Sequence, residues 1–355
     1  MQTRCYLCGC NTFNIFDVKN QVDTSKTCLN SRLQSVQLIP SSPATANSEV
    51  SHVDLSWHSI ITLTSDAELY ISGFHGGKDH KDKLIESNVD CFDRLWDSVL
   101  FISKNGKLLV KHGDTSIPVE VELAANNKLV QISCTDEDTY ILTDEGSVKR
   151  CSHSENCWSV NDMDLDFKVA QIACGKEHTL LLSESGQVYS CGSGSRGQLG
   201  HGEIDVTVQS SPKLVEDLDG VRMKQVAAGG WHSVALSEIG DVYIWGWNES
   251  GQLGFTNDLS SEAVNFLLQP TLLNIDGEES IQKVVCGSRH TVALTENGDL
   301  FTWGWNKYGQ LGLGDQTQSN KCFKPTKVSQ IVIKDERLVD IYAGAWNTAV
   351  ITKIL

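Results

Sequence analysis

Three groups of residues in this sequence have types and spacings that could support chemistry. The stretch GWNESGQLG at 246–254 has the glycine content of a phosphate-binding loop, in which backbone N–H groups converge on an anion. The motif CYLCGC at 5–10 brings three thiols together, as many zinc sites do. His178, His232 and His290 could act as general acids or bases. Whether these residues bind a phosphate, bind zinc or act in catalysis depends on the strands and loops that carry them.

The surroundings of these residues repeat along the chain. Three segments align without a gap, and the three histidines then share one column. These segments start at Val169, Met223 and Ile281. Weaker copies between residues 51 and 151 place Ser59, Ser98 and Asp138 in the histidine column. The six copies share a turn position, which is occupied by Ala67, Gly106, Gly146, Gly186, Gly240 and Gly298. A repeat of this kind determines the fold and must be recognised before any single motif is judged.

A seventh copy is divided between the two ends of the chain. The segment IYAGAWNTAVITKIL at 341–355 stops where the turn should come, and RCYLCGCN at 4–11 matches the strand that should follow. Each copy alternates apolar and polar residues between glycine turns, which predicts short strands. We therefore expect an all-β fold, a seven-bladed β-propeller whose ring closes by pairing the N-terminal strand with the C-terminal strands. We expect one domain over 1–355, with the last blade shared between residues 1–16 and 339–355.

Segments between the repeats are expected to be connections outside the repeat core. The long ones are 17–49, 255–280 and 313–337. The chain has no apolar stretch long enough to span a bilayer and no secretory leader, so we expect a soluble intracellular protein with no membrane contact.

With the repeat in place, all three groups are interpreted as structural. GQLG recurs at 197–200, 251–254 and 309–312 without a following Lys-Ser or Lys-Thr pair, which favours a scaffold loop over a phosphate site. Cys8, Cys151 and Cys191 fall in a column that elsewhere holds tryptophan, which favours buried thiols over metal ligands. The histidines each precede Ser or Thr, so we expect a shared hydrogen bond within each blade. No catalytic residue, metal site or cofactor is predicted, and the protein is not expected to be an enzyme.

Two columns of the repeat change their chemistry from blade to blade, as positions that contact a partner do. The column before the histidine holds Glu177, Trp231, Arg289 and Trp346, and a second column holds Cys10, Ser193, Trp247 and Trp305. Trp and Arg dominate the energetics of protein interfaces. The predicted partner-binding patch consists of Trp231, Trp247, Glu249, Arg289, Trp305, Lys307, Tyr308 and Trp346. The alternative is that these tryptophans only wedge between blades, which we prefer for Trp245 and Trp303 in the core column.

The charge of the chain constrains its partner. The formal net charge is −16, and no block of Lys and Arg provides a stripe for phosphates. We therefore expect no extended direct contact with DNA. The acidic balance favours a basic protein partner, such as a histone tail.

The pattern G-x-x-H-[ST], followed by V-Y-x-W-G-x-N-x-x-G-Q-L-G, is similar to the repeats of the regulator of chromosome condensation family. The resemblance is specific over 169–314, extends to the divided seventh copy, and is poor over 51–151. It implies a monomeric, non-catalytic chromatin regulator in a heteromeric complex. Its partner would be a JmjC-domain Fe(II)/2-oxoglutarate oxygenase that demethylates or hydroxylates histones, with histones as a second partner. It further implies a role in histone methylation and chromosome segregation, and a nuclear, chromosome-associated location with a cytoplasmic pool. The alternative activity is guanine-nucleotide exchange on a Ran-type small GTPase, for which blades 51–151 lack the G-Q-L-G loop.

Overall fold

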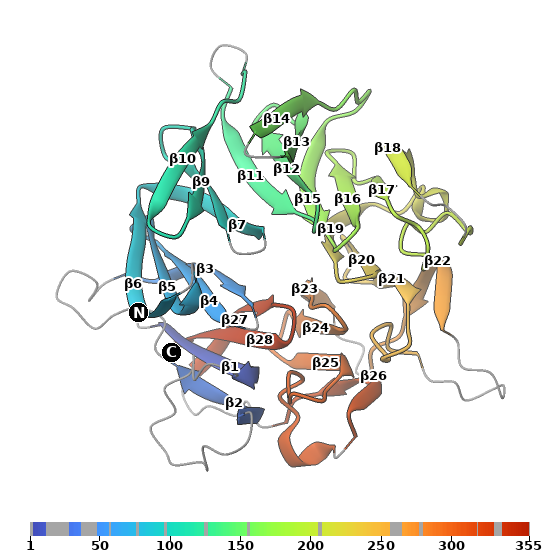
Figure 1. The fold of residues 1–355 in the computed structure, drawn as a ribbon. Coiled ribbons are helices and arrows are strands. Elements are labelled where there is room, and N and C mark those ends of the chain that lie inside the picture. The colour runs from blue at the N-terminus through green and yellow to red at the C-terminus, as the bar shows by residue number, and fades with distance from the viewer. Residues whose placement is uncertain are drawn as a thin grey trace.

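The described part of the chain was obtained as a computed structural model. It covers residues 3–11, 28–36, 48–56, 58–75, 78–95, 98–123, 127–154, 157–204, 208–255, 265–276, 280–317, 319–329 and 336–354. Its strands form seven four-stranded antiparallel sheets arranged as blades around a central channel (Figure 1). The prediction of an all-β, seven-bladed propeller is confirmed. No helix in these ranges is long and apolar enough to cross a membrane.

The strands follow one another from the channel outward in each blade. The first blade contains β3 (Val50–Leu55), β4 (Ser59–Thr64), β5 (Glu68–His75) and β6 (Lys78–Ser87). The second contains β7 (Val89–Leu95), β8 (Ser98–Ser103), β9 (Leu108–His112) and β10 (Thr115–Val119). The third contains β11 (Leu129–Cys134), β12 (Asp138–Thr143), β13 (Val148–Ser154) and β14 (Cys157–Asp162). The fourth contains β15 (Val169–Cys174), β16 (His178–Ser183), β17 (Val188–Gly192) and β18 (Gln209–Leu214). The fifth contains β19 (Met223–Ala228), β20 (His232–Ser237), β21 (Val242–Trp247) and β22 (Phe266–Leu273). The sixth contains β23 (Ile281–Cys286), β24 (His290–Thr295), β25 (Leu300–Trp305) and β26 (Lys321–Lys327). The seventh contains β27 (Glu336–Ala343), β28 (Asn347–Ile354), β1 (Thr3–Asn11) and β2 (Cys28–Val36). Two short 3₁₀ helices are η1 (Glu216–Leu218) and η2 (Gly314–Gln316).

The seventh blade joins the two ends of the chain, as the divided repeat predicted. Strand β1 pairs antiparallel with β28, with Cys5 opposite Ile351 and Gly9 opposite Asn347. On its other edge β1 pairs with β2. The two ends lie side by side in Figure 1. A ring closed in this way has no open end that needs a cap.

The turn column of the repeat has one backbone conformation in six blades. Its residue has a positive φ in every copy, from 64° at Ala67 to 95° at Gly240. Glycine adopts this conformation without a steric cost, which explains its presence in five of these six positions. The strand pairing confirms the alignment, because Ser59, His178 and His290 each lie opposite a glycine on the next strand.

The long segments 17–49, 255–280 and 313–337 are not only connections, which corrects the sequence-based expectation. Each contains the outermost strand of a blade, namely β2, β22 or β26. Strand β22 shows why the pattern was missed, since Leu273 is its one buried residue and the others are exposed or half-buried. A strand at the rim has little apolar alternation to detect.

The hydrophobic core lies between neighbouring blades. One cluster combines Val234 and Ile244 of the fifth blade with Val284, Ala293 and Trp303 of the sixth. Polar side chains add bonds between the innermost strands. Three glutamines each donate to and accept from a backbone position in the next blade, pairing Gln131 with Ile172, Gln171 with Val226 and Gln225 with Val284.

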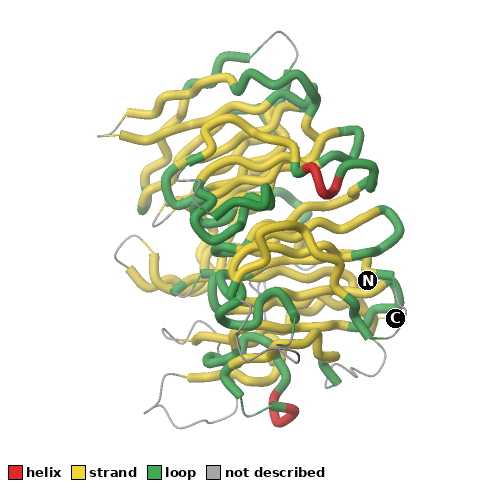
Figure 2. The backbone as a smooth tube through the Cα atoms, turned by 90° about the vertical axis from the view of Figure 1, so that its right-hand side faces the viewer, coloured by secondary structure: helices red, strands yellow, loops and turns green. Residues whose placement is uncertain are grey.

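Strands run between two faces of the ring, where the connections gather (Figure 2). One face carries the connections from the first strand of each blade to the second and from the third strand to the fourth. We call it the loop face. It includes all three GQLG segments and the residues that precede the histidine column. The opposite face carries the hairpin turns and the connections between blades.

Candidate functional site

The three repeated histidines hold adjacent blades together. His178 Nε2 lies 2.9 Å from Ser233 Oγ, and His232 Nε2 lies 3.0 Å from Thr291 Oγ1. His290 Nε2 lies 3.1 Å from Thr348 Oγ1. Each hydroxyl belongs to the following blade. The predicted structural role is correct. The expected hydrogen bond within a blade is wrong, because each histidine packs against the second strand of the following blade.

The other partner of each hydroxyl determines the histidine tautomer. Ser233, Thr291 and Thr348 donate their protons to backbone carbonyls of the GQLG loops, over 2.8, 2.9 and 2.7 Å. A hydroxyl has one proton to donate, so it accepts its second bond from the Nε2–H of the histidine. We call this arrangement of histidine, hydroxyl and loop carbonyl the histidine latch.

Burial keeps the latch histidines neutral. All three have no solvent exposure, and the loss of hydration lowers the pKa of His178 and His232 to about 3 and that of His290 to about 4. Such side chains cannot reach a substrate in solvent. They are packing and hydrogen-bonding residues.

The GQLG loops complete the same junction. Gln252 O accepts from Trp303 Nε1 over 2.9 Å as well as from Thr291, and Gln198 O accepts from Trp245 Nε1 over 2.9 Å. In the seventh blade the tryptophan is replaced by Cys8, whose Sγ lies 3.3 Å from Gln310 O. The prediction that these loops are scaffold is supported by their contacts with the next blade. Trp245 and Trp303 have no exposure, as expected for the core column.

The cysteines in the tryptophan column are buried packing residues. Cys8, Cys151 and Cys191 have at most 1% exposure. Burial raises the pKa of Cys8 and Cys151 to about 12 and that of Cys191 to about 11. Thiols in this state are protonated and unreactive. The side chain of Cys10 lies outside the described residues.

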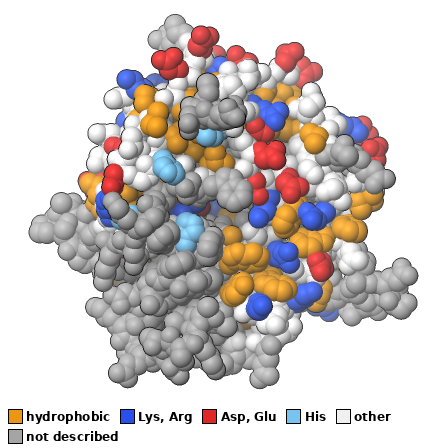
Figure 3. Space-filling model, in the orientation of Figure 1, with side chains coloured by type: hydrophobic (Ala, Val, Ile, Leu, Met, Phe, Trp, Pro, Cys, Tyr) orange, Lys and Arg blue, Asp and Glu red, His pale blue; other side chains and the backbone are white. Residues whose placement is uncertain are grey.

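All of the predicted partner-binding residues lie on the loop face, in the fifth, sixth and seventh blades. Trp231, Arg289 and Trp346 belong to the connections that precede the second strands of these blades. Trp247 and Trp305 end β21 and β25, while the others lie in the loops that follow these strands. Figure 3 shows hydrophobic and basic side chains gathered over these blades, at and below the centre of the view toward the right.

Tryptophans and cations alternate across this face. Arg196 Cζ lies 4.4 Å from the ring centroid of Trp231 and 5.3 Å from that of Trp247. Arg289 Cζ lies 4.6 Å from the ring of Trp247 and 5.8 Å from that of Trp305. A lysine ends the series on each side, with Lys176 Nζ 5.2 Å from the Trp231 ring and Lys321 Nζ 5.9 Å from the Trp305 ring. The aromatic–cation ladder is this set of residues: Lys176, Trp231, Arg196, Trp247, Arg289, Trp305 and Lys321.

The ladder changes the sequence-based interpretation of one tryptophan. Trp247 was predicted to contact a partner, but only 8% of its surface is exposed. Arg196 and Arg289 both stack on its ring, and Trp231 contacts it edge-on with centroids 5.5 Å apart. Trp247 therefore supports the ladder from beneath, while Trp231 and Trp305 are only half-buried.

The remaining predicted residues lie beside the ladder. Tyr308 and Trp346 form a second aromatic pair, with ring centroids 5.8 Å apart. The side chains of Glu249 and Lys307 are exposed, and Lys321 Nζ donates to Glu249 O over 2.8 Å.

Sequence reasoning missed Lys176, Arg196 and Lys321. Arg196 precedes the first GQLG in the column that holds Ser250 and Tyr308 in later copies. That column varies as strongly as the columns that hold Trp231 and Trp247. The same pattern therefore predicts that Arg196 contacts a partner. Lys321 lies in β26, a rim strand without a repeat signal.

The arginines of the ladder differ in their partners from Arg94, Arg150 and Arg222. Arg94 pairs with Asp54 at 2.6 Å, Arg150 with Asp138 at 2.6 Å, and Arg222 with Glu238 at 3.0 Å. Among the described residues, Arg196 and Arg289 have no carboxylate partner, and their guanidinium groups lie over tryptophan rings. Within the part of the chain that the structure describes, these two cations thus have no carboxylate at ion-pair distance.

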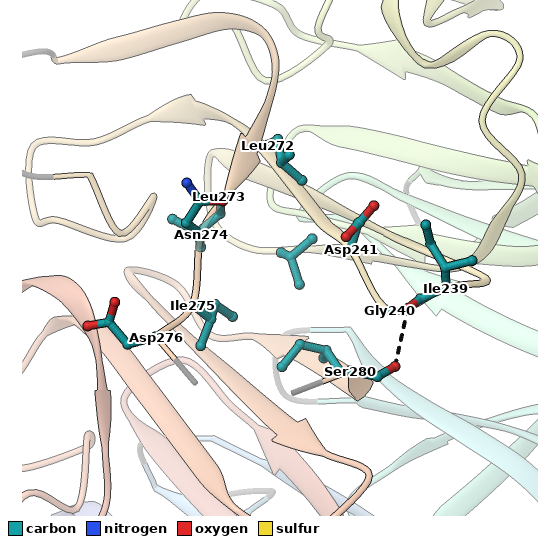
Figure 4. A pocket seen from close by; sticks show the side chains of 11 residues that line it. Ile239, Gly240, Asp241, Leu272, Leu273, Asn274, Ile275, Asp276 and Ser280 are labelled. Carbon is teal, nitrogen blue, oxygen red and sulfur yellow. Dashed lines mark hydrogen bonds between the residues drawn. The ribbon is translucent and has the colours of Figure 1, made fainter. Parts of the chain in front are cut away.

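A hollow on the opposite face offers no comparable chemistry. It lies between the fifth and sixth blades and is lined by Ile239, Leu272 and Ile275, with Asp241 and Asp276 at its margin (Figure 4). Its Ser280 hydroxyl donates to Ile239 O over 3.3 Å. The described lining contains no histidine, cysteine, lysine or arginine.

Comparison with known proteins shows the family of the chain. Residues 100–354 match the family model described as RCC1-like domain, and the chain belongs to this family. RCC1 domain-containing protein 1 from Homo sapiens is 41% identical over 191 residues, which are 45% of this chain and 50% of the relative. The ultraviolet-B receptor UVR8 from Arabidopsis thaliana is 30% identical over 264 residues, 74% of this chain and 45% of the relative. The matches thus span about half the length of these relatives.

Solved structures agree with the architecture. Prp20p from Saccharomyces cerevisiae superimposes with a TM-score of 0.81 at 17% identity, covering 99% of this chain and 92% of Prp20p. Human WBSCR16 gives a TM-score of 0.55 at 20% identity, with complete coverage of both chains. At these identities the likeness concerns the fold alone.

Proposed function

We propose that this protein is a non-catalytic, chromatin-associated adaptor that binds a protein partner through its loop face. The aromatic–cation ladder is the observation that carries this proposal. It combines tryptophan and arginine, the residues that contribute most to interface energies, on one continuous surface of three adjacent blades. The binding surface consists of the ladder together with Glu249, Lys307, Tyr308 and Trp346.

The partner follows from the family relationship. The proposed partner, which the resemblance of the repeats implies, is a JmjC-domain Fe(II)/2-oxoglutarate oxygenase that acts on histones, with this chain contributing to the regulation of histone methylation and to chromosome segregation. The iron and the co-substrate would belong to that partner. The corresponding location is the nucleus, on chromosomes.

Affinity capture from nuclear extract, followed by mass spectrometry, tests the proposal. The intact chain should retain a JmjC oxygenase, and the double variant Trp231→Ala/Trp346→Ala should lose it, because both clusters of aromatic rings are disrupted. Trp158→Ala is the matched control, since this half-buried tryptophan lies on β14 of the third blade, away from the ladder. Unchanged far-UV circular dichroism would establish that both variants are folded. Retention of the same partner by the double variant would refute the assignment of the surface.

A second candidate is guanine-nucleotide exchange on a Ran-type small GTPase. It is favoured by the fold shared with Prp20p, a protein described with binding to Gsp1p and histones. Histones are a second candidate partner on the same ground. The described first, second and third blades have short connections between their third and fourth strands in place of GQLG loops, which disfavours exchange. Release of labelled GDP from Ran in the presence of the purified chain tests it directly.

A further inference from the structure

We infer that the aromatic–cation ladder binds an acidic peptide segment of the partner, through salt bridges from Arg196 and Arg289 to its carboxylates. This inference rests on the proposed function, because it states the chemistry of the segment that the loop face takes. It also reverses the expectation drawn from net charge, which favoured a basic partner.

The first argument is the state of the two arginines. The guanidinium group of each lies over tryptophan rings, with Arg196 Cζ 4.4 Å from the Trp231 centroid and Arg289 Cζ 4.6 Å from the Trp247 centroid. A stacked guanidinium still presents N–H donors at its edge, in the geometry that a carboxylate accepts with two parallel hydrogen bonds. Stacking also fixes the side chain before the partner arrives, so less conformational entropy is lost on binding.

The second argument is the local balance of charge. The loops that build this surface carry the cations Lys176, Arg196, Arg289, Lys307 and Lys321. The same connections also carry carboxylates: Glu177, Glu203 and Glu249 are exposed, and the sequence adds Asp205, Asp258, Glu262 and Asp315. Lys176 already has a counter-charge, since its Nζ lies 3.9 Å from Asp136. The ladder itself contains four cations and no carboxylate, so its remaining positive charge is at Arg196, Arg289 and Lys321.

The third argument separates a peptide from a single-stranded nucleic acid. Phosphates would satisfy the same arginines, but nucleic acids also stack their bases on open aromatic faces. Here cations lie over the rings of Trp231, Trp247 and Trp305. A short acidic segment fits the surface better.

Fluorescence anisotropy with labelled peptides tests the inference on the full chain. The probes are a peptide of alternating glutamate and tyrosine, its glutamine and lysine counterparts, and oligouridylate RNA. We expect the glutamate peptide to bind at least about tenfold more tightly than the glutamine peptide, equivalent to about 1.4 kcal/mol, and the affinity to fall as salt is raised. We also expect no binding of the lysine peptide and weaker binding of the RNA than of the glutamate peptide.

Single arginine variants show whether the glutamate peptide binds at the ladder. Arg289→Gln and Arg196→Gln should each weaken the glutamate peptide about tenfold. Arg222→Gln is the matched control, because Arg222 lies on the opposite face beside Glu238 and should leave the affinity unchanged. Thermal unfolding of each variant reports on its fold. The inference is overturned if the glutamate peptide does not bind, if the glutamine peptide or the RNA binds as tightly, or if Arg222→Gln has the same effect as Arg289→Gln.

The two proposals can fail separately. If Trp231→Ala/Trp346→Ala still captures the nuclear partner while Arg289→Gln weakens the glutamate peptide, the proposed function at this surface is wrong and the acidic specificity stands. If the tryptophan variant loses the partner while glutamate and glutamine peptides bind equally, the surface is correct and its acidic specificity is wrong.

Discussion

The histidine latch makes a quantitative prediction about the junction between the fifth and sixth blades. His232, Thr291 and Gln252 have no solvent exposure, so no water can replace a bond that is removed. Thr291→Val keeps the size of the side chain and deletes its hydroxyl. The Nε2–H of His232 then loses its acceptor at 3.0 Å, and Gln252 O loses one of its two donors.

The expected cost follows from these two losses. A buried donor left without a partner costs about 1–3 kcal/mol, and a net hydrogen bond contributes about 1 kcal/mol. We therefore expect Thr291→Val to lower the free energy of unfolding by about 2–3 kcal/mol. Thr291→Ser keeps the hydroxyl and removes one methyl group, which costs about 1 kcal/mol. The fifth blade already has serine at the equivalent position, where Ser233 bonds His178 Nε2 and Gln198 O.

Urea unfolding followed by tryptophan fluorescence provides the measurement. The order of the midpoints should be wild type, then Thr291→Ser, then Thr291→Val, with an unchanged denaturant slope so that the midpoints report stability. If only hydrophobicity and volume mattered, Thr291→Val would have a higher urea midpoint than Thr291→Ser. If Thr291→Val is at least as stable as Thr291→Ser, the latch does not stabilise the ring in the way described.

Two further predictions concern the same junctions. A Cβ at Gly287 would lie 2.1 Å from His290 Cε1 and 2.5 Å from Gly344 O, so Gly287→Ala should destabilise the protein by about 3 kcal/mol or more. Gly106→Ala, where φ is 74° and a Cβ meets no atom within 4 Å, should cost only about 1 kcal/mol, and equal urea midpoints for the two variants would contradict the latch geometry. The depressed pKa values of the latch histidines mean that the unfolded chain, with histidines titrating near 6.5, binds more protons than the native state between about pH 4 and 6.5. Stability is therefore fully present above pH 6.5 and falls on acidification, by up to about 1.4 kcal/mol per pH unit for each histidine. Burial raises the pKa of Asp93 to about 7, which acts in the opposite direction, but one group does not outweigh three, so an unchanged urea midpoint between about pH 7 and 5 would contradict the prediction.

The repeat made the ring predictable from sequence, and the limits of that prediction have physical causes. His232 and the strand alternation around it are local, so the column and its blade could be recognised. Its partner Thr291 lies 59 residues away, and only the packing of one blade on the next brings the two together. The rim strands could not be recognised, because exposed strands such as β22 carry no apolar pattern.

The candidate site was predictable in part for the same reason. Variable columns identified Trp231, Trp247 and Arg289, since each belongs to a single copy of the repeat. They did not reveal that Arg196 of the preceding blade lies over the rings of both Trp231 and Trp247. Net charge was misleading about the partner, because a total of −16 does not describe one face of the molecule.

The pairing of β1 with β28 also sets the order of events at the ribosome. Strand β1 can pair with β2 early, but its edge toward β28 remains unpaired until residue 354 has emerged. Contacts so distant along the chain form slowly. During that interval the nascent polypeptide exposes unpaired strand edges, which makes it a substrate for chaperones and leaves truncated products prone to aggregate.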